Sequence, residues 1–504
     1  MRTPPIALTG GGVRIGDVVR VARASAAVAV TQETLDRVTQ AREVVERLAA
    51  GDVPIYGVTS ALGANTGKAI AEGERAAYQL RAIRARAVGV GPRHPPEVVR
   101  AAMFARAAGM ACGGSGVSPA VLQMLVAMLN AGVHPVVPSR GSIGVADLAP
   151  LSHIALVLIG QGEAELGGMV LPGADALSRA GLSPVTLGAK DGLALISANA
   201  VTVGHAALVL DECMRALDAF NVAAALSFEA FRANLTPLDP RVQSARQARG
   251  QQEIAQRLVT LLEQSGLWRQ GAARRVQDPL SFRCVTQVHG AALAALATAR
   301  DDVEVELNSA ADSPLVLSAS NEMLSNGNFH VPALALAFDT LAMALSHCAT
   351  LCVGRCQRQY SPALSELPLQ LTSRGPEHSG FATIQKTLTA LANEIRHLAN
   401  PASLDFMPVS ESVEDHAPMA ANVVAKASRM TPLLREIAAI ELLTAAQGID
   451  LRPVPLHTLG HGARAAYDLV RARVPMLDED RPLGPDVERI AGSLDALPLA
   501  ALLP

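Results

Sequence analysis

Residues 192–231 read GLALISANAVTVGHAALVLDECMRALDAFNVAAALSFEAF, and this long apolar stretch decides what kind of fold the chain can form. It is longer than an ordinary strand and its apolar residues do not alternate with polar ones, so we predict a helix. Because it is apolar on nearly all sides, the helix belongs in the middle of a bundle. Ionisable side chains interrupt it at His205, Asp211 and Glu212, which a membrane span rarely tolerates. We therefore expect a buried core helix and no membrane association.

Two more segments share this character, Val285 to Asp302 and Val331 to Gln359. Together the three predict a mostly α protein with a long central helical bundle. We expect a smaller N-terminal part, residues 1–190, followed by residues 191–504, which hold the bundle and the C-terminal helices. Periodicity and capping signals predict further helices at 31–48, 72–88, 96–110, 118–131, 148–160, 381–398, 416–447 and 463–474. The best strand-like pieces are SPLVLS at 313–318 and a hairpin at GGMVLPG, 167–173.

Composition and charge exclude several classes of protein. The chain has 504 residues, half of them apolar, and a formal net charge of −3. A chain of this size can bury a large core, but it lacks the basic stripe of a nucleic-acid-binding surface. The N-terminal residues MRTPPIALTGGGVRIGDVV contain no apolar run before a small-residue cleavage site. We predict no signal peptide and a cytoplasmic location.

Two clusters of potential metal ligands are more simply explained as structural. Cys348, Cys352 and Cys356 recur on one face of an expected helix, but no CxxC pair accompanies them and buried free cysteine is common. His457 and His461 have helical spacing, but Gly460 and nearby prolines oppose a helix there. We expect no metal site at either place.

Seven separated stretches contain the residues suited to chemistry. In chain order they read PIYGVTSALG (54–63), GSIGVADLAPLSHIALVLIGQGEA (141–164), AKDGLALIS (189–197), VQDPLSFRCVTQVHG (276–290), ELNSAADSPLV (306–316), SNGNFHVPALA (325–335) and SVEDHAPMA (412–420). Together they resemble the histidine and aromatic amino acid ammonia-lyase family over nearly the whole chain. The resemblance implies the family's fumarase/aspartase-like helical fold, a homotetramer, a small-molecule substrate, and active sites assembled from several chains.

One motif departs from the family in the residues that matter most. Members with lyase or aminomutase activity have Ala-Ser-Gly before the Asp-Leu-Ala-Pro-Leu sequence, and that tripeptide forms the electrophile methylidene-imidazolone. Here Val145 and Ala146 fill the place, one residue too few and without the Ser and Gly that the cyclisation needs. Ser142 lies nearby, but the β-branched Ile143 follows it and disfavours the same cyclisation. We predict a chain without this electrophile and without cofactor or metal.

Two further positions that adjoin the electrophile in the family also differ. Leu280 replaces a tyrosine, and Ser197 replaces an asparagine that helps hold the electrophile's oxygen. We interpret the three losses as one coordinated change, with Ser197 as a substrate-binding position.

Other residues match the family's pocket. Tyr56 corresponds to the loop tyrosine that removes the β proton of the substrate, although a phenol with an ordinary pKa of about 10 needs positive neighbours to act as a base near neutrality. Arg283 corresponds to the arginine that pairs with the substrate carboxylate, with the fork geometry suited to it. Asn328 and Phe329 correspond to pocket-lining residues, and Glu414 to a carboxylate that faces the imidazole or amino end of the substrate.

Two cations occupy positions where the family pattern does not expect them. Arg86 stands where histidine ammonia-lyases have a histidine, and we predict that it binds substrate. Lys386 falls on an apolar helix position, where a charge is costly unless paired, so it is a candidate catalytic residue; the alternative is that it projects into solvent. We assign Asn308, Asp312 and His330 mainly to structural hydrogen bonding.

A known branch of the family, the ergothionases, also lacks the tripeptide. The electrophile helps an unactivated amine to leave, whereas a trimethylammonium group leaves as neutral trimethylamine without such help. The resemblance to this branch implies elimination of trimethylamine from ergothioneine, giving thiolurocanate, with Tyr56 as the base. The alternatives are a different lyase or addition enzyme on a histidine-derived or aryl substrate, and a non-catalytic relative with a binding role.

Overall fold

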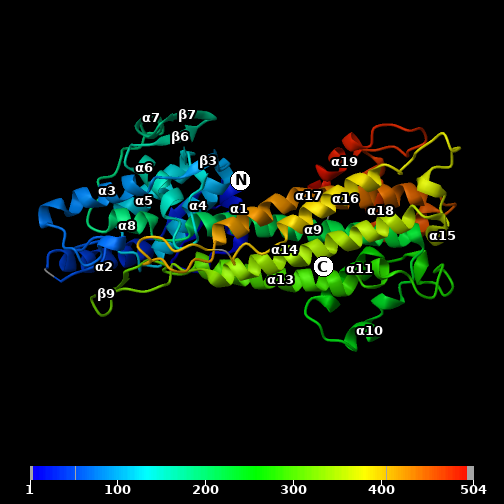
Figure 1. The fold of residues 1–504 in the computed structure, drawn as a ribbon, viewed down its shortest axis with the longest axis horizontal. Helices are drawn as coiled ribbons and strands as arrows, with labels where there is room; N and C mark the ends of the chain where they lie inside the picture. Colours follow the sequence, from blue (N-terminus) through cyan, green and yellow to red (C-terminus); the bar gives the residue numbers. More distant parts are fainter. Residues whose placement is uncertain (1–3, 52, 405, 497–504) are drawn as a thin grey trace. The chain divides into compact units, whose positions relative to one another are not determined.

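The computed structural model describes residues 4–51, 53–404 and 406–496, so the ends of the two expected parts, 1–3 and 497–504, lie outside the described residues. The chain is mostly helical, as the sequence predicts (Figure 1). It divides into two compact units, each built from three separate stretches of sequence. Unit 1 comprises Met1–Asp211, Ala299–Phe338 and Pro401–Ala425, and unit 2 comprises Glu212–Thr298, Asp339–Asn400 and Lys426–Pro504. The expected parts are continuous in sequence, whereas the units are not, because four long helices have residues in both.

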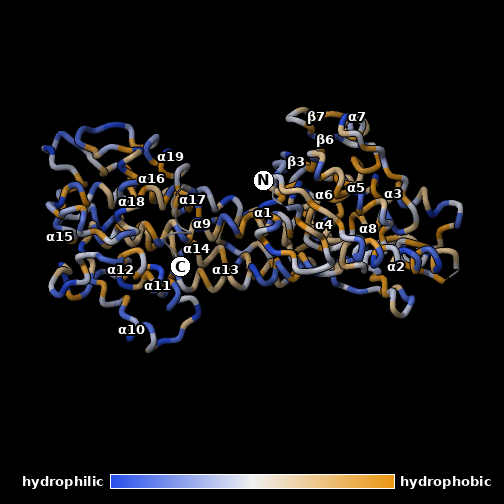
Figure 2. The backbone as a smooth tube through the Cα atoms, turned by 180° about the vertical axis from the view of Figure 1, so that it is seen from behind, coloured by the Kyte–Doolittle hydropathy of each residue, from blue (hydrophilic) through white to orange (hydrophobic). Residues whose placement is uncertain are grey.

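Unit 1 combines short helices with small sheets. Its helices are α1 (Ile15–Arg23), α2 (Gln32–Ala49), α3 (Arg75–Arg86), α4 (Pro96–Ala111), α5 (Pro119–Asn130), α6 (Leu148–Leu158), α7 (Gly173–Arg179) and α8 (Asp191–Ile196). Capping explains two of the starts: the Thr31 hydroxyl accepts from the Thr34 amide at α2, and Pro119 occupies the first turn of α5. Apolar residues concentrate along α4, α5 and α6 (Figure 2). These helices form the core of unit 1.

The sheets of unit 1 are short. Strands β1 (Ile6–Leu8) and β2 (Val28–Val30) pair in parallel, with Ile6 opposite Val28. The other pairings are antiparallel: β3 (Val90–Arg93) with β5 (Pro138–Arg140), β4 (His134–Pro135) with β6 (Glu163–Leu166), β6 with β7 (Met169–Pro172), and β8 (Leu315–Leu317) with β9 (Glu322–Leu324). The predicted hairpin is confirmed as β6 and β7, and the strand-like SPLVLS contains β8.

The four long helices are α9 (Ala200–Phe231), α13 (Val285–Leu307), α14 (Pro332–Gln359) and α17 (Ala420–Asp450). Within unit 2 they run alongside one another (Figure 1), where the buried Arg355 of α14 pairs with Glu441 of α17, Nε to Oε1 2.5 Å. Ser227 of α9 donates to the same carboxylate at 2.6 Å. The shorter helices of unit 2 are α10 (Pro240–Ser244), α11 (Gln251–Leu261), α12 (Leu280–Arg283), α15 (Pro362–Ser365), α16 (Ile384–Leu398), α18 (His461–Arg471) and α19 (Gly484–Ala491).

Two expected helices need correction. The stretch 192–231 is two helices, α8 and α9, because the chain leaves helical geometry at Ser197, whose ψ is +61°. The helix expected at 416–447 begins only at Ala420. Pro418 disfavours helical geometry at Ala417, and Met419 has a left-handed φ of 51°, so the helix can begin only after it.

Three cysteines and two long apolar segments lie in the helical bundle. Cys348, Cys352 and Cys356 are free and buried, and burial raises the pKa of the Cys348 thiol to about 12. Among the described residues, no group of three or more His, Cys, Asp or Glu side chains could hold a metal ion. Two helical segments, 191–231 and 332–359, are long and apolar enough to cross a membrane by length and composition alone; 94% of the most apolar window of the first and 50% of that of the second are buried in the protein. A long apolar helix in the core of a helical bundle has the same length and composition.

Candidate active site

Unit 1 contains a cavity of about 1380 Å³. Its walls come from six places in the sequence: the loop after α2, the end of α3, the altered loop before α6, the C-terminal end of α8, the segment around β9, and residues 410–416. The volume exceeds that of a typical small-molecule site, which is up to about 1,000 Å³. Of the predicted site residues, those that line the cavity are Tyr56, Arg86, Ser197, Phe329 and Glu414.

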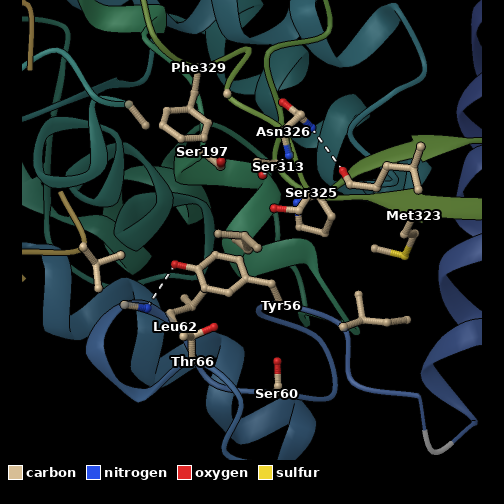
Figure 3. Close-up of a pocket in the computed structure, with 18 of the residues that line it drawn as sticks. Tyr56, Ser60, Leu62, Thr66, Ser197, Ser313, Met323, Ser325, Asn326 and Phe329 are labelled. Atoms are coloured by element: carbon tan, nitrogen blue, oxygen red, sulfur yellow. Dashed lines mark hydrogen bonds between the residues drawn. The ribbon is translucent and has the colours of Figure 1, made fainter. Parts of the chain in front are cut away.

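Tyr56 reaches the cavity from an irregular loop. Figure 3 shows its ring extending from the loop, with Ser197 and Phe329 above the ring in this view. The amide of Gly63 donates to the Tyr56 hydroxyl oxygen at 3.0 Å. The loop turns at Gly57, whose φ is +70°, and a Cβ there would lie 2.5 Å from Leu193 Cδ2. Only glycine therefore allows the loop to pack this closely against α8.

The altered loop presents Val145 and Ala146 to the cavity. Ala146 has a left-handed φ of +55°. Val145 pairs with His330 in a single antiparallel β-bridge. Asp147 fixes the end of the loop: its buried carboxylate accepts from the Thr202 amide at 2.7 Å and from the Ser142 hydroxyl at 2.6 Å. Burial raises the pKa of Asp147, against the opposing effect of these hydrogen bonds. Ser142 is thus engaged in holding the loop.

The break between α8 and α9 places Ser197 in the cavity wall, where it is only 6% exposed. The carbonyl of Ala198 accepts from the Asp147 amide at 2.7 Å, so the break and the altered loop hold each other. Asn199 donates to the carbonyl of Phe329. This backbone link fixes the segment that carries Phe329 against the break.

The residues around Phe329 differ in their placement. Asn328 is exposed and does not line the cavity; its amide nitrogen lies 3.5 Å from the carbonyl of Ala310. His330, which we expected to be structural, does line the cavity and its Nε2 lies 2.8 Å from Nδ1 of His416. Burial, followed by the neighbouring His416, lowers the pKa of His330. The histidine pair thus connects the Phe329 segment to the segment that carries Glu414.

Hydroxyl and amide groups form another part of the wall. Figure 3 shows Ser60, Thr66, Ser313, Ser325 and Asn326 around Tyr56 and Met323. Sequence reasoning did not select these residues or His416, although His416 lies within the SVEDHAPMA motif. The motif alone gives no sign that His416 meets a histidine 86 positions earlier.

Arg86 is the only Lys or Arg among the described residues that line the cavity. It lies in the last turn of α3, where its guanidinium donates to the carbonyl of Ala82 at 3.1 Å. Three acidic side chains also line the cavity: Glu322, Glu414 and Asp415. The cavity therefore has a single guanidinium and several carboxylates.

Arg283 and Lys386 belong to unit 2 and are not among the residues that line this cavity. Arg283 ends the short helix α12 and is partly exposed. Lys386 lies in the first turn of α16 and is exposed, so within one chain it projects into solvent. Leu280, the position that replaces the family's tyrosine, is 59% exposed.

Asn308 and Asp312 have the structural roles we predicted. Asn308 accepts from the Val13 amide and donates to the Val13 carbonyl, both at 2.8 Å. Asp312 forms a buried ion pair with Arg106, at 2.7 Å. The buried Lys190 lies in the same charged group, and burial lowers its pKa to about 8. This buried group adjoins the cavity wall through Ser313.

Comparisons with known proteins agree with this architecture. The aromatic amino acid lyase family matches residues 13–472. The histidine ammonia-lyase of Gloeobacter violaceus is 40% identical over 488 residues, covering 96% of this chain and 95% of that protein. The histidine ammonia-lyase of Myxococcus xanthus is 39% identical, covering 99% of both chains.

Solved structures are also similar. The ergothionase of Treponema denticola, solved with desmethyl-ergothioneine sulfonic acid, has a TM-score of 0.94 and 33% identity, covering 98% of this chain and 99% of that chain. The tyrosine aminomutase of Streptomyces globisporus has a TM-score of 0.93 and 32% identity, covering 99% of this chain and 98% of that chain. The match of sequence and fold over nearly the whole length identifies a carbon–nitrogen lyase, and the chain belongs to the aromatic amino acid lyase family.

Proposed function

We propose that the protein eliminates trimethylamine from ergothioneine, or from a closely related histidine betaine, without a methylidene-imidazolone electrophile. The observation that carries the proposal is the altered loop. Val145 and Ala146 occupy the cavity wall, and they supply neither the serine nor the glycine from which the electrophile forms. Identity to histidine ammonia-lyases is higher than to ergothionase, so the substrate is argued from the site and not from overall similarity.

The cavity lining supports a cationic leaving group. A quaternary ammonium is attracted to aromatic faces, and Tyr56 and Phe329 both line the cavity. The carboxylates of Glu322, Glu414 and Asp415 add negative charge around it. Trimethylamine then leaves as a neutral molecule and needs no electrophile to accept its nitrogen.

Proton removal is the remaining step, and we assign it to Tyr56. The phenolate takes the β proton, the C–H electrons form the new double bond, and the C–N electrons leave with trimethylamine. The amide of Gly63 donates to the tyrosine oxygen, and such a bond is stronger when the acceptor is an anion. Arg86 supplies positive charge in the same cavity and binds the negative end or the sulfur of the substrate.

We assign Arg283 and Lys386 to the active site of a neighbouring subunit. Both lie in unit 2, and neither lines the cavity of unit 1. In a homotetramer with sites shared between chains, Arg283 of one subunit binds the carboxylate in the cavity of another, and Lys386 stabilises negative charge on the ring or its sulfur. Asn328, exposed beside the cavity, contacts substrate in the same assembled, cytoplasmic enzyme.

The test is steady-state kinetics of the purified protein with ergothioneine, hercynine and histidine, measuring trimethylamine, ammonia and the absorbance of the acrylate product. We expect trimethylamine and thiolurocanate from ergothioneine and no ammonia from histidine. Turnover of histidine would overturn the proposal in favour of an ordinary ammonia-lyase. Intact mass spectrometry provides an independent check, since formation of the electrophile removes two waters and we expect the unmodified mass.

A further inference from the structure

We propose that helix α3 positions the base, and that Tyr78 and Gln79 on this helix are positioning residues for Tyr56. This inference rests on the proposed role of Tyr56 in proton removal. Both residues bind the backbone of the loop that carries Tyr56. Neither one lines the cavity among the described residues.

Tyr78 acts through two consecutive peptide groups. Its hydroxyl oxygen accepts from the amide of Leu62 at 2.8 Å. The next amide, that of Gly63, donates to the Tyr56 hydroxyl at 3.0 Å. The two phenols are therefore bound by neighbouring N–H groups of one short backbone segment. Holding the first N–H on Tyr78 fixes the orientation from which the second reaches Tyr56.

Gln79 holds the other end of the loop. Its Nε2 donates to the carbonyl of Gly57 at 2.9 Å, and its Oε1 accepts from the amide of Leu193 at 3.1 Å. The side chain is 1% exposed, so both hydrogen bonds are shielded from water. Gln79 thereby joins three segments, α3, the residue after Tyr56, and α8.

Packing reinforces these hydrogen bonds. Leu62, Ala82 and Leu193 form a buried apolar cluster, and the rings of Tyr56 and Tyr78 pack against it. Gly63, however, has a φ of +62° and no neighbour within 4 Å of a Cβ position. The carbonyls of Leu62 and Gly63 accept from the amides of Asn65 and Thr66, at 3.4 and 2.9 Å, so side-chain hydroxyls hold the two amides of this segment while backbone amides hold its carbonyls. Loss of the Tyr78 hydroxyl removes one of these restraints and leaves the Leu62 amide without its acceptor.

The chemical consequence concerns the phenolate of Tyr56. An N–H donor binds an anionic oxygen more strongly than a neutral one, so the Gly63 amide favours the form that acts as a base. A hydrogen bond to a charged group is worth enough to move an ionisation by about one pH unit. In Tyr78→Phe we expect Tyr56 to ionise about one pH unit higher, and the rising limb of the pH–kcat profile to move with it. We expect KM to change by less than about threefold, because Tyr78 does not line the cavity.

The experiment is a spectrophotometric titration of tyrosinate, which needs no substrate. The chain has only four tyrosines, so subtracting the titration of Tyr56→Phe from that of the wild type isolates Tyr56. The same subtraction with Tyr78→Phe and the double variant gives Tyr56 without the Tyr78 hydroxyl. An unchanged ionisation of Tyr56 in Tyr78→Phe would overturn the proposal.

Two further variants keep the result interpretable. Tyr360→Phe is the matched control, since its buried phenol bonds the Thr444 hydroxyl at 2.8 Å in unit 2. It should lower Tm without moving the Tyr56 ionisation, and an equal shift would show general loosening and refute positioning. Gln79→Met keeps the volume but removes both hydrogen bonds, and should shift Tyr56 in the same direction as Tyr78→Phe.

The titration also separates this inference from the proposed function. If ergothioneine is not turned over but Tyr78→Phe still shifts Tyr56, the positioning role stands and the substrate assignment fails. If turnover is present but Tyr56 does not shift, the positioning role fails and the substrate assignment stands.

Discussion

Two loops carry the two candidate catalytic side chains of unit 1, and they are held in different ways. The Tyr56 loop is fixed by side chains of another element, with Gln79 bonded to Gly57 and Tyr78 to Leu62. The segment that carries Glu414 closes on itself, through backbone hydrogen bonds between Val409 and Glu414 at 3.0 and 3.3 Å. Side chains of helix α3 hold the Tyr56 loop, whereas backbone hydrogen bonds within the segment hold the Glu414 loop.

The backbone of the Glu414 segment is also strained. Ser410, Glu411 and Ser412 all have left-handed φ values, 56°, 55° and 62°. Outside glycine, this conformation costs roughly 1–2 kcal/mol per residue, so three in succession need support from their surroundings. In the described residues of unit 1, that support includes the contact between His330 and His416. We therefore expect the Tyr56 loop to keep its geometry better than the Glu414 segment does when its own residues are perturbed, and the variants below test this difference.

The largest expected effect comes from removing the base. Tyr56→Phe should lower kcat for ergothioneine by about 10²–10⁴-fold while leaving substrate affinity within a few-fold, because only the proton acceptor is lost. Rapid-quench or steady-state kinetics together with isothermal titration measures both quantities. Tyr467→Phe, whose hydroxyl bonds to Asp450 in unit 2, is the control and should keep the wild-type rate. Full turnover by Tyr56→Phe would show that Tyr56 is not the base.

The next effect comes from disturbing the fixed loop without touching Tyr56. In Gly57→Ala the new Cβ would lie 2.5 Å from Leu193 and 2.8 Å from Leu62, at a φ of +70°. Strain and overpacking together should cost about 2–5 kcal/mol and lower kcat at least tenfold. Thermal unfolding and kinetics measure the two losses. Gly67→Ala, at φ +84° with open space around its Cβ, tests strain alone and should cost only about 1–2 kcal/mol.

Glu414→Gln should leave stability nearly unchanged, unlike Gly57→Ala, and its effect should fall mainly on substrate binding. Glu414→Gln removes a negative charge from the lining, and losing one charged hydrogen bond or ion contact corresponds to about a 10–100-fold fall in kcat/KM. Because the carboxylate binds the substrate and does not take the proton, we expect much of the change in KM. Glu411→Gln is the matched control, since Glu411 lies in the same segment but does not line the cavity. Equal losses in both variants would contradict the assignment.

The smallest effect is a pH-dependent loosening of the Glu414 segment. Two neutral imidazoles, or one neutral and one protonated, can share the hydrogen bond between His330 and His416, but two protonated imidazoles cannot. The pKa of His330 is lowered, so this bond should be kept near neutrality and lost as the pH falls below about 6.5. Hydrogen exchange of residues 409–416, corrected for the intrinsic pH dependence, should rise in that range.

The Tyr56 loop provides the internal comparison in the same exchange experiment. Its contacts involve the Gln79 amide and backbone groups, which do not titrate between pH 5 and 7, so protection of residues 55–63 should stay constant. His416→Asn should abolish the pH dependence at 409–416. If both loops loosen together, the distinction between them fails.

Much of the fold could be predicted from local signals. Thr31 and Pro119 mark helix starts, and the paired glycines at 167 and 168 mark a hairpin. The break at Ser197 could not be predicted, because neither glycine nor proline occurs there and the flanking residues are equally apolar. It depends on the tertiary hydrogen bond between Asp147 and Ala198.

The site was predictable where a side chain itself lines the cavity, as with Tyr56, Phe329 and Glu414. Tyr78 and Gln79 were not predictable, because their partners are backbone amides and carbonyls that leave no mark in the sequence. His330 was assigned mainly to structural hydrogen bonding, and it does bond His416; its place in the cavity wall was not predicted, since His416 is distant in the chain. The roles of Arg283 and Lys386 depend on an assembly of chains and stay predictions.

The most direct test of the central claim is a competition experiment with one preparation of enzyme and equal concentrations of ergothioneine and histidine, in which the released nitrogen compounds are identified. An elimination without the electrophile predicts trimethylamine at a steady rate and no ammonia. Ammonia released from histidine would contradict the account, because only an electrophile makes that amine leave.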